Sequence, residues 1–194
     1  MSVGEAADFD LLIAAAADGR DEALTTLYRA HQPAVVRFLA GLAPDEAEDL
    51  AADTWIDMFR GIHRFSGDEQ DFRRLLFTIA RRRAIDARRK HWRRKTDPTD
   101  FGGRPGPTQG GDISDVVADL DASRRAVEHI SALLPRLQAE VILLRVVAGL
   151  SVSDVAQIVG KTPAAVSVLQ TRGLQRLASR VGDPARWERA TGRR

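Results

Sequence analysis

Cysteine is absent from this chain of 194 residues, and no apolar run approaches the length of a membrane span. Without cysteine, disulfides, thiolate metal sites and thiol redox sensing within the chain are excluded. A membrane-spanning helix needs about 20 mostly apolar residues in a row, which no stretch provides. The N-terminal segment is acidic and lacks the basic and apolar regions of a signal peptide. We therefore expect a soluble, cytoplasmic protein with no membrane partner.

Aromatic residues and histidines are also scarce. Aromatics make up 6% of the chain, whereas alanine and leucine are abundant, which favours helices over a sheet. The histidines are scattered without the spacing of a metal site: His31, His63, His91 and His129. Carboxylates and arginines show no nucleophile–base pair, glycine-rich phosphate loop or metal-ligand set. We expect an all-α protein that binds no metal, needs no cofactor and catalyses no reaction.

Lysine is rare too, so the positive charge is almost entirely arginine. The 29 basic and 27 acidic residues leave a net charge of only +2. A high arginine content can reflect a GC-rich genome, so the position of the charges is more informative than their number. The two most uneven stretches are an acidic one at 45–60 and a basic one at 71–95.

The acidic stretch predicts an amphipathic helix with one apolar and one acidic face. The acidic ladder comprises Glu46, Asp49, Asp53 and Asp57. No basic residue precedes Arg60, and like charges at this spacing destabilise a helix slightly. A solvated helix face would explain the ladder, but its lack of compensation favours a basic partner.

The basic stretch predicts a long helix with an apolar side and a densely basic remainder. Its basic residues are Arg73, Arg74, Arg81, Arg82, Arg83, Arg88, Arg89, Lys90, Arg93, Arg94 and Lys95. Phosphate is the obvious counter-charge, and Phe65 and Trp92 could stack on unpaired bases. The alternatives are a solvated face and a membrane-surface helix, although the apolar side is needed for the domain core.

A third stretch, residues 150–172, predicts two short helices joined by a glycine turn. Ser151 and Asp154 have capping-box spacing, Gly160 suits a left-handed helix end, and Thr162 precedes a proline in the first turn of the next helix. This is the pattern of a helix-turn-helix, whose second helix enters a DNA major groove. The same pattern also forms ordinary corners in helical proteins.

Glycine, proline, threonine and aspartate dominate the middle of the chain, which predicts a flexible linker. The chain is thereby divided into a helical domain at 1–95, a linker at 96–114, a helix-turn-helix domain at 115–182 and a basic tail at 183–194.

These stretches, in this order, resemble the extracytoplasmic-function (ECF) group of sigma-70 family RNA polymerase sigma factors. Residues 48–60 resemble that family's core-binding helix, 72–89 its promoter-melting helix, and 134–172 its promoter-upstream module. Three positions depart from the family pattern. Leu75 stands where tryptophan is usual, Arg82 where asparagine is usual and Ala52 where glutamine is usual.

The resemblance implies that the two domains are like sigma regions 2 and 4, and that the chain directs core polymerase to promoters and promotes DNA melting. It implies contacts to the largest polymerase subunits from Asp49, Leu50, Asp53, Trp55 and Arg60. It implies contacts to the −10 promoter element from His63, Arg64, Phe65, Arg81, Arg82, Arg83, Asp86, Arg88 and Arg89. It implies contacts to the −35 element from Lys161, Thr162, Ala165, Ser167, Thr171 and Arg172. An anti-sigma factor is an expected further partner.

Three other functions are compatible with parts of the sequence. A stand-alone helix-turn-helix repressor would explain only the C-terminal domain, and it predicts a dimerisation surface and palindromic sites. A nuclease would need a metal or general-base constellation, which is missing. A helical adaptor that never touches DNA would leave the basic helix unexplained.

Overall fold

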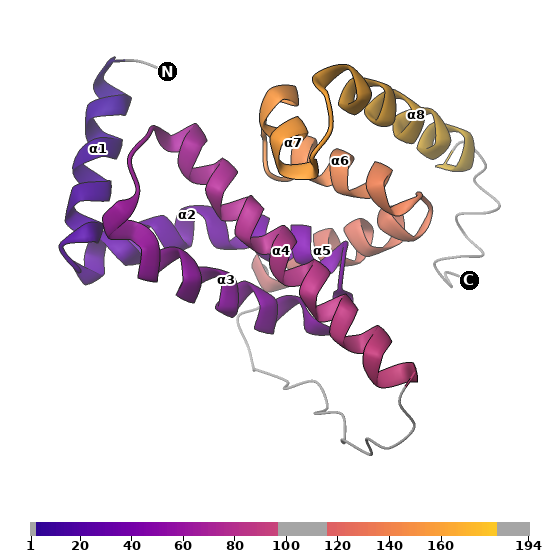
Figure 1. The fold of residues 1–194 in the computed structure, drawn as a ribbon, viewed down its shortest axis with the longest axis horizontal. Helices are drawn as coiled ribbons and strands as arrows, with labels where there is room; N and C mark the ends of the chain where they lie inside the picture. Colours follow the sequence, from indigo (N-terminus) through magenta and orange to yellow (C-terminus); the bar gives the residue numbers. More distant parts are fainter. Residues whose placement is uncertain (1–2, 97–115, 182–194) are drawn as a thin grey trace.

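The computed structural model describes residues 3–96 and 116–181, in which all regular secondary structure is helical (Figure 1). The helices are α1 (Val3–Ala17), α2 (Asp21–Ala40), η1 (Pro44–Glu46), α3 (Ala47–Gly61), η2 (Ile62–Arg64), α4 (Glu69–Thr96), α5 (Val116–Ala132), α6 (Arg136–Val146), α7 (Val152–Val159) and α8 (Pro163–Val181). The predicted all-α fold is confirmed. No helix within these residues is long and apolar enough to cross a membrane.

The N-terminal half is a bundle of α1 to α4, in which α3 packs on both α2 and α4. Its centre is aromatic: Phe38 of α2 meets Phe77 of α4 edge to face, with ring centroids 5.4 Å apart. Both residues are buried, with at most 1% of their surface exposed. Burying rings of this size supplies much of the packing that holds the four helices together. The far end of α4 projects beyond the bundle (Figure 1).

The C-terminal half is built around α6, which is buried along most of its length. The predicted capping box at the start of α7 is confirmed, because the Ser151 side chain accepts from the Asp154 N–H while the Asp154 carboxylate accepts from the Ser151 N–H. Gly160 ends α7 in the left-handed conformation, with φ +66° and ψ +44°, which glycine adopts at little cost. Helix α8 then starts at Pro163 and packs on α6 and α7.

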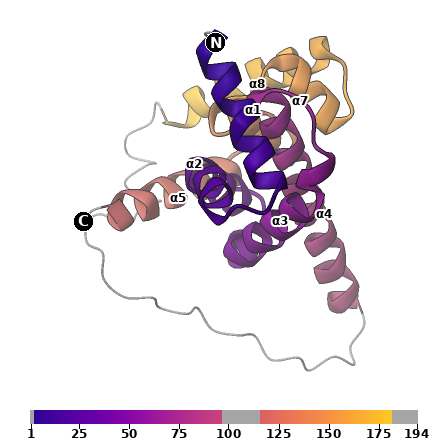
Figure 2. The same ribbon diagram turned by 90° about the vertical axis from the view of Figure 1, so that its left-hand side faces the viewer.

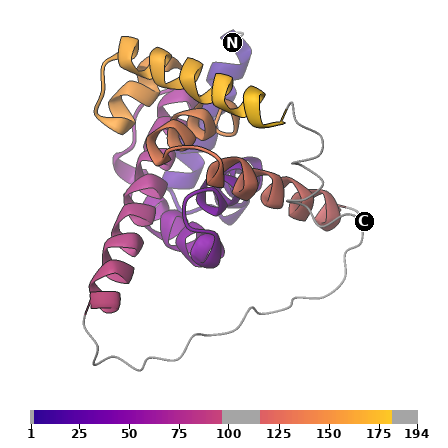
Figure 3. The same cartoon turned by 90° about the vertical axis from the view of Figure 1, so that its right-hand side faces the viewer.

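The two halves pack against each other and share one hydrophobic core. Helix α2 lies against α5, and α4 lies against α7 (Figures 2 and 3). The approach is close at Gly41, where a Cβ atom would lie 2.5 Å from Cδ1 of Leu143 and 2.7 Å from Oγ of Ser131. The sequence predicts two domains but not this contact between them. The predicted linker at 96–114 and tail at 183–194 lie almost wholly outside the described residues.

Candidate polymerase and promoter interfaces

Two of the four acids of the ladder lie beside a basic side chain. Asp49 is exposed on α3, but Asp57 accepts from Nε of Arg83 at 2.9 Å, and Asp53 lies 3.5 Å from the same guanidinium. The hydrogen bond to Asp57 is the main cause of the raised pKa of Arg83. The expectation of an uncompensated ladder is therefore wrong for Asp53 and Asp57, because α4 brings Arg83 across from a distant part of the sequence.

Two residues assigned to polymerase binding are core residues in this structure. Leu50 is 7% exposed and Trp55 is 3% exposed. The indole Nε1 of Trp55 donates to Oε1 of Gln32 at 2.6 Å, and its ring packs on Tyr28. These side chains face α2 because they are the apolar side of an amphipathic helix. Asp49, Asp53 and Arg60 are the exposed members of the set, and of these Asp53 lies beside Arg83.

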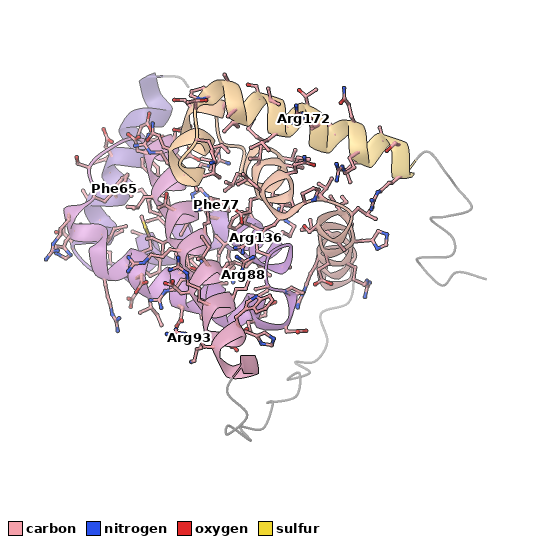
Figure 4. The ribbon with its side chains drawn as sticks, turned by 45° about the vertical axis from the view of Figure 1, so that its right-hand side comes forward. Phe65, Phe77, Arg88, Arg93, Arg136 and Arg172 are labelled. Carbon is pink, nitrogen blue, oxygen red and sulfur yellow. The ribbon has the colours of Figure 1, made fainter. Side chains whose placement is uncertain are left out.

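The distal half of α4 presents a basic surface to solvent. The side chain of Arg82 is 83% exposed and that of Arg89 is 73% exposed, and Asp86 lies within 4 Å of both. A surface hollow of about 500 Å³ is lined by Asp86, Arg88, Arg89, Trp92 and Arg93. Figure 4 shows Arg88 and Arg93 along this projecting end of the helix. Closely spaced guanidinium groups beside an exposed indole suit a phosphate backbone with unstacked bases.

Arg81 and Arg83, which the sequence groups with these arginines, point elsewhere. Arg81 donates from Nε to Glu140 at 2.9 Å and from Nη1 to the carbonyl of Ile158 at 3.2 Å. Arg83 is held by the acids of α3. In this arrangement both guanidinium groups are engaged by carboxylates of the chain itself, Arg81 by the C-terminal half and Arg83 by α3.

The loop before α4 forms a second hollow. His63 and Arg64 are exposed, whereas Phe65 is half-buried, with its ring edge to face against Phe72 at 5.7 Å. A pocket of about 450 Å³ is lined by Gly61, Arg64, Phe65, Ser66, Asp71, Arg74, Leu75, Thr78 and Gln157. Gln157 comes from α7, so the pocket lies between the two halves.

On the helix-turn-helix, the predicted outward residues are indeed exposed: Lys161, Thr162, Ser167, Thr171 and Arg172. Ala165 is half-buried. Thr162 Oγ1 accepts from the backbone N–H of Ala165 at 3.2 Å, which makes Thr162 a helix cap as well as a candidate contact. Figure 4 shows Arg172 on α8, at the opposite end of the view from Arg93.

Sequence reasoning missed three charged residues that join the halves: Arg124, Glu140 and Asp154. Glu140 was detectable in principle, as a single acid inside the apolar run of α6. Asp154 was assigned only to the capping box, yet it also accepts from Nε2 of Gln70 at 3.0 Å and lies 3.3 Å from Nη1 of Arg74. Burial alone would raise the pKa of Asp154, but hydrogen bonds from Ser151, Gln70 and Arg74 outweigh it and lower the pKa.

An acid-faced helix, an arginine-rich helix and a helix-turn-helix on one helical body define a class of DNA-binding transcription protein. Within the described residues, no group of three or more His, Asp or Glu side chains is arranged to hold a metal ion.

Comparison with known proteins identifies the family. Residues 27–94 match the family model of Sigma-70 region 2, and residues 124–177 match that of Sigma-70, region 4. The chain is 30% identical over 186 residues to the ECF RNA polymerase sigma factor SigD of Mycobacterium tuberculosis, covering 89% of this chain and 83% of SigD. It is 28% identical over 177 residues to the ECF sigma factor ShbA of Streptomyces griseus, covering 86% and 91%.

Two solved structures share the fold. CnrH, in complex with the cytosolic domain of CnrY, superposes with a TM-score of 0.62 at 20% identity, covering 91% of this chain and 98% of CnrH. The sigma factor RpoE of Bartonella quintana, in complex with the anti-sigma factor NepR, superposes with a TM-score of 0.61 at 23% identity, covering 82% and 97%.

The chain belongs to the ECF sigma factors of the sigma-70 family. It is a promoter-specificity subunit that directs core RNA polymerase to promoters and promotes DNA melting, and the predicted function is confirmed.

Proposed function

We propose that three separate surfaces divide the work of this sigma factor. The exposed side of α3, with Asp49 and Arg60, docks on the largest subunits of core polymerase. The loop of His63 and Arg64 and the projecting half of α4 hold the −10 element. The outward residues of α8 and its preceding turn read the −35 element. The corresponding domain limits are 1–95 and 115–182, joined by residues 96–114.

The observation that carries this proposal is the separation of charge on the N-terminal half. Acidic residues remain exposed at the start of α3, while exposed arginines continue along α4 past the end of the bundle. A basic protein surface and a nucleic acid can therefore bind at the same time without competing for one face.

The partners and location follow from the same assignment. Core polymerase and promoter DNA meet in the cytoplasm, which is where we place this chain. The fold neighbours CnrH and RpoE are both in complex with a second protein, an anti-sigma factor in the case of RpoE. We propose that this chain also binds an anti-sigma factor. Charged side chains act here as binding faces, so we assign the chain no catalytic step.

The decisive experiment is charge reversal on α3. Asp49→Arg should abolish co-purification with core polymerase and run-off transcription, because it brings a cation to a surface that faces a basic partner. Asp10→Arg, at an exposed acid of α1, introduces the same change in charge and should leave both unchanged. Far-UV circular dichroism confirms that both variants fold. If Asp49→Arg binds polymerase as well as Asp10→Arg does, the docking assignment fails.

A further inference from the structure

We infer that Val168, on the outward face of α8, is a specificity-determining residue that contacts the 5-methyl group of a thymine in the −35 element. This inference rests on the proposed function, because it requires α8 to enter the major groove there. It adds which chemical group of the bases the helix recognises. Of the four bases, only thymine carries a methyl group in the major groove, so such a contact identifies its base.

Val168 lies in the part of α8 that meets base edges when a recognition helix enters the groove. Helix α8 begins at Pro163, shortly after the turn at Gly160, so Val168 is in its second turn. The N-terminal residues of a recognition helix are those that contact the bases. Val168 is 47% exposed, and it shares its face of the helix with the exposed residues Ala164 and Thr171. Helix α8 forms an outer edge of the C-terminal half (Figures 1 and 3).

The first two turns of α8 offer few groups that could read a base by hydrogen bonds. Residues 163–170 include no charged residue and no asparagine. The Ser167 hydroxyl donates to the carbonyl of Pro163 at 3.1 Å. Gln170 is half-buried, and its Oε1 accepts from Nε of Arg145 at 3.3 Å. Since glutamine recognises adenine with both its oxygen and its nitrogen, this bond withdraws it from such a contact. Apolar contact is what remains.

A valine in a helix is well suited to contact a methyl group. Its χ1 angle is confined mainly to one rotamer, so its two methyl groups are ordered before DNA binds and little side-chain entropy is lost. The contact removes apolar surface of both partners from water. Guanine or cytosine at the same place would turn a polar edge toward Val168 and lose water without gaining a hydrogen bond. The valine therefore favours thymine and disfavours the more polar base edges.

Exposure alone does not assign this contact, and Leu174 of the same helix shows the difference. Leu174 is 46% exposed, almost as much as Val168. It lies six residues further along, in the fourth turn and about 120° around the helix axis from Val168. It therefore lies past the turns that enter the groove. This makes Leu174 a matched control for the loss of an exposed apolar side chain.

Two exposed cations flank the apolar face, Lys161 before α8 and Arg172 in its third turn. Phosphate contacts from such residues position a helix on DNA but carry no sequence information directly. Affinity and specificity are thus assigned to different side chains. A substitution of Val168 should change which base is preferred while the salt dependence of binding stays the same, because no phosphate contact is lost.

The test exchanges thymine for uracil, which removes only the 5-methyl group. The full chain in complex with core polymerase first selects its upstream element from duplexes that are randomised over that element. Each thymine of the selected element is then replaced singly by deoxyuridine, and binding is measured. One replacement should weaken wild-type binding about fourfold, the factor expected for one methyl-sized group buried in the contact. A selected element without thymine, or one in which no replacement weakens binding, would overturn the inference.

The assignment to Val168 is tested by repeating the measurement with variants. In Val168→Ala the same replacement should weaken binding by less than about twofold, because the shortened side chain no longer covers the methyl group. Leu174→Ala should keep the fourfold difference, and far-UV circular dichroism confirms that both variants fold. If Val168→Ala retains the full difference, another residue contacts the methyl group and the inference is wrong.

Failure of the proposed function has a different signature. If the complex with core polymerase enriches no upstream element at all, α8 does not read the −35 element, and the inference falls with that assignment. If an element is enriched and protected from cleavage but deoxyuridine has no effect anywhere in it, the helix reads the element and only the methyl contact is refuted.

Discussion

His31 gives a quantitative test of how the core beneath α4 responds to acid. Its imidazole is 7% exposed and lies against the ring of Phe72, with centroids 5.3 Å apart. Burial, assisted by the positive charge of Arg73, lowers the pKa of His31 from 6.5 to about 4. The folded protein therefore keeps this imidazole neutral where the unfolded chain would protonate it.

The direction and size of the effect follow from this shift. Because the folded pKa is the lower one, the unfolded state binds more protons, and stability must fall as pH drops through the window from 6.5 to about 4. Linkage gives a loss of about 2 kcal/mol in the free energy of unfolding between pH ~7.5 and pH ~5. His31→Phe keeps an aromatic ring and removes the titrating group, so it should lack this component.

The assay is equilibrium urea unfolding of both proteins at several pH values, followed by far-UV circular dichroism. Other groups titrate in the same range, so the informative quantity is the difference between the wild type and His31→Phe. Wild type should lose about 2 kcal/mol more than the variant. If both lose the same amount, the imidazole is not held neutral in the core and the reasoning about its burial is wrong.

Three further outcomes are expected. The double substitution Arg88→Ala with Arg89→Ala should weaken open-complex formation. It should also reduce the slope of log affinity against log salt concentration by the equivalent of about two phosphate contacts. Permanganate reactivity of the melted region equal to that of the wild type would contradict this. Arg172→Ala should weaken footprinting of the upstream element by about 1 kcal/mol or more, while Arg125→Ala should not; an unaltered footprint would refute a phosphate contact. Gly160→Ala should destabilise the helix-turn-helix by about 1 kcal/mol because φ is +66°, measured by thermal unfolding, and an unchanged melting temperature would count against strain there.

The sequence was sufficient for most local structure. Helix caps and breakers act over three or four residues, so Ser151, Gly160 and Pro163 could be assigned their positions without any knowledge of the fold. The outward placement of Ser167 and Arg172 followed from the 3.6-residue period of the second helix. Each of these features depends on neighbours in the sequence.

Contacts between residues far apart in the sequence could not be predicted from the sequence. Asp57 and Arg83 are 26 residues apart, and Arg81 and Glu140 are 59 apart. A charge pattern shows that a partner is needed and does not show whether that partner is solvent, DNA or another helix of the same chain. The burial of Leu50 and Trp55 could not be predicted for a related reason: a motif indicates which helix docks, while only the packing shows which of its side chains remain outside.

The arginines of α4 show why their number is a poor guide to DNA affinity. Residues seven apart share a helix face, and successive residues are turned by about 100°. Arg74 and Arg81 therefore point together toward α7, Arg82 and Arg89 point together into solvent, and Arg83 points toward α3. One helix thus uses its charge to join the two halves, to present cations to solvent and to fix its own bundle. Because Glu140 already engages Arg81, the number of arginines in α4 overstates the number that face solvent.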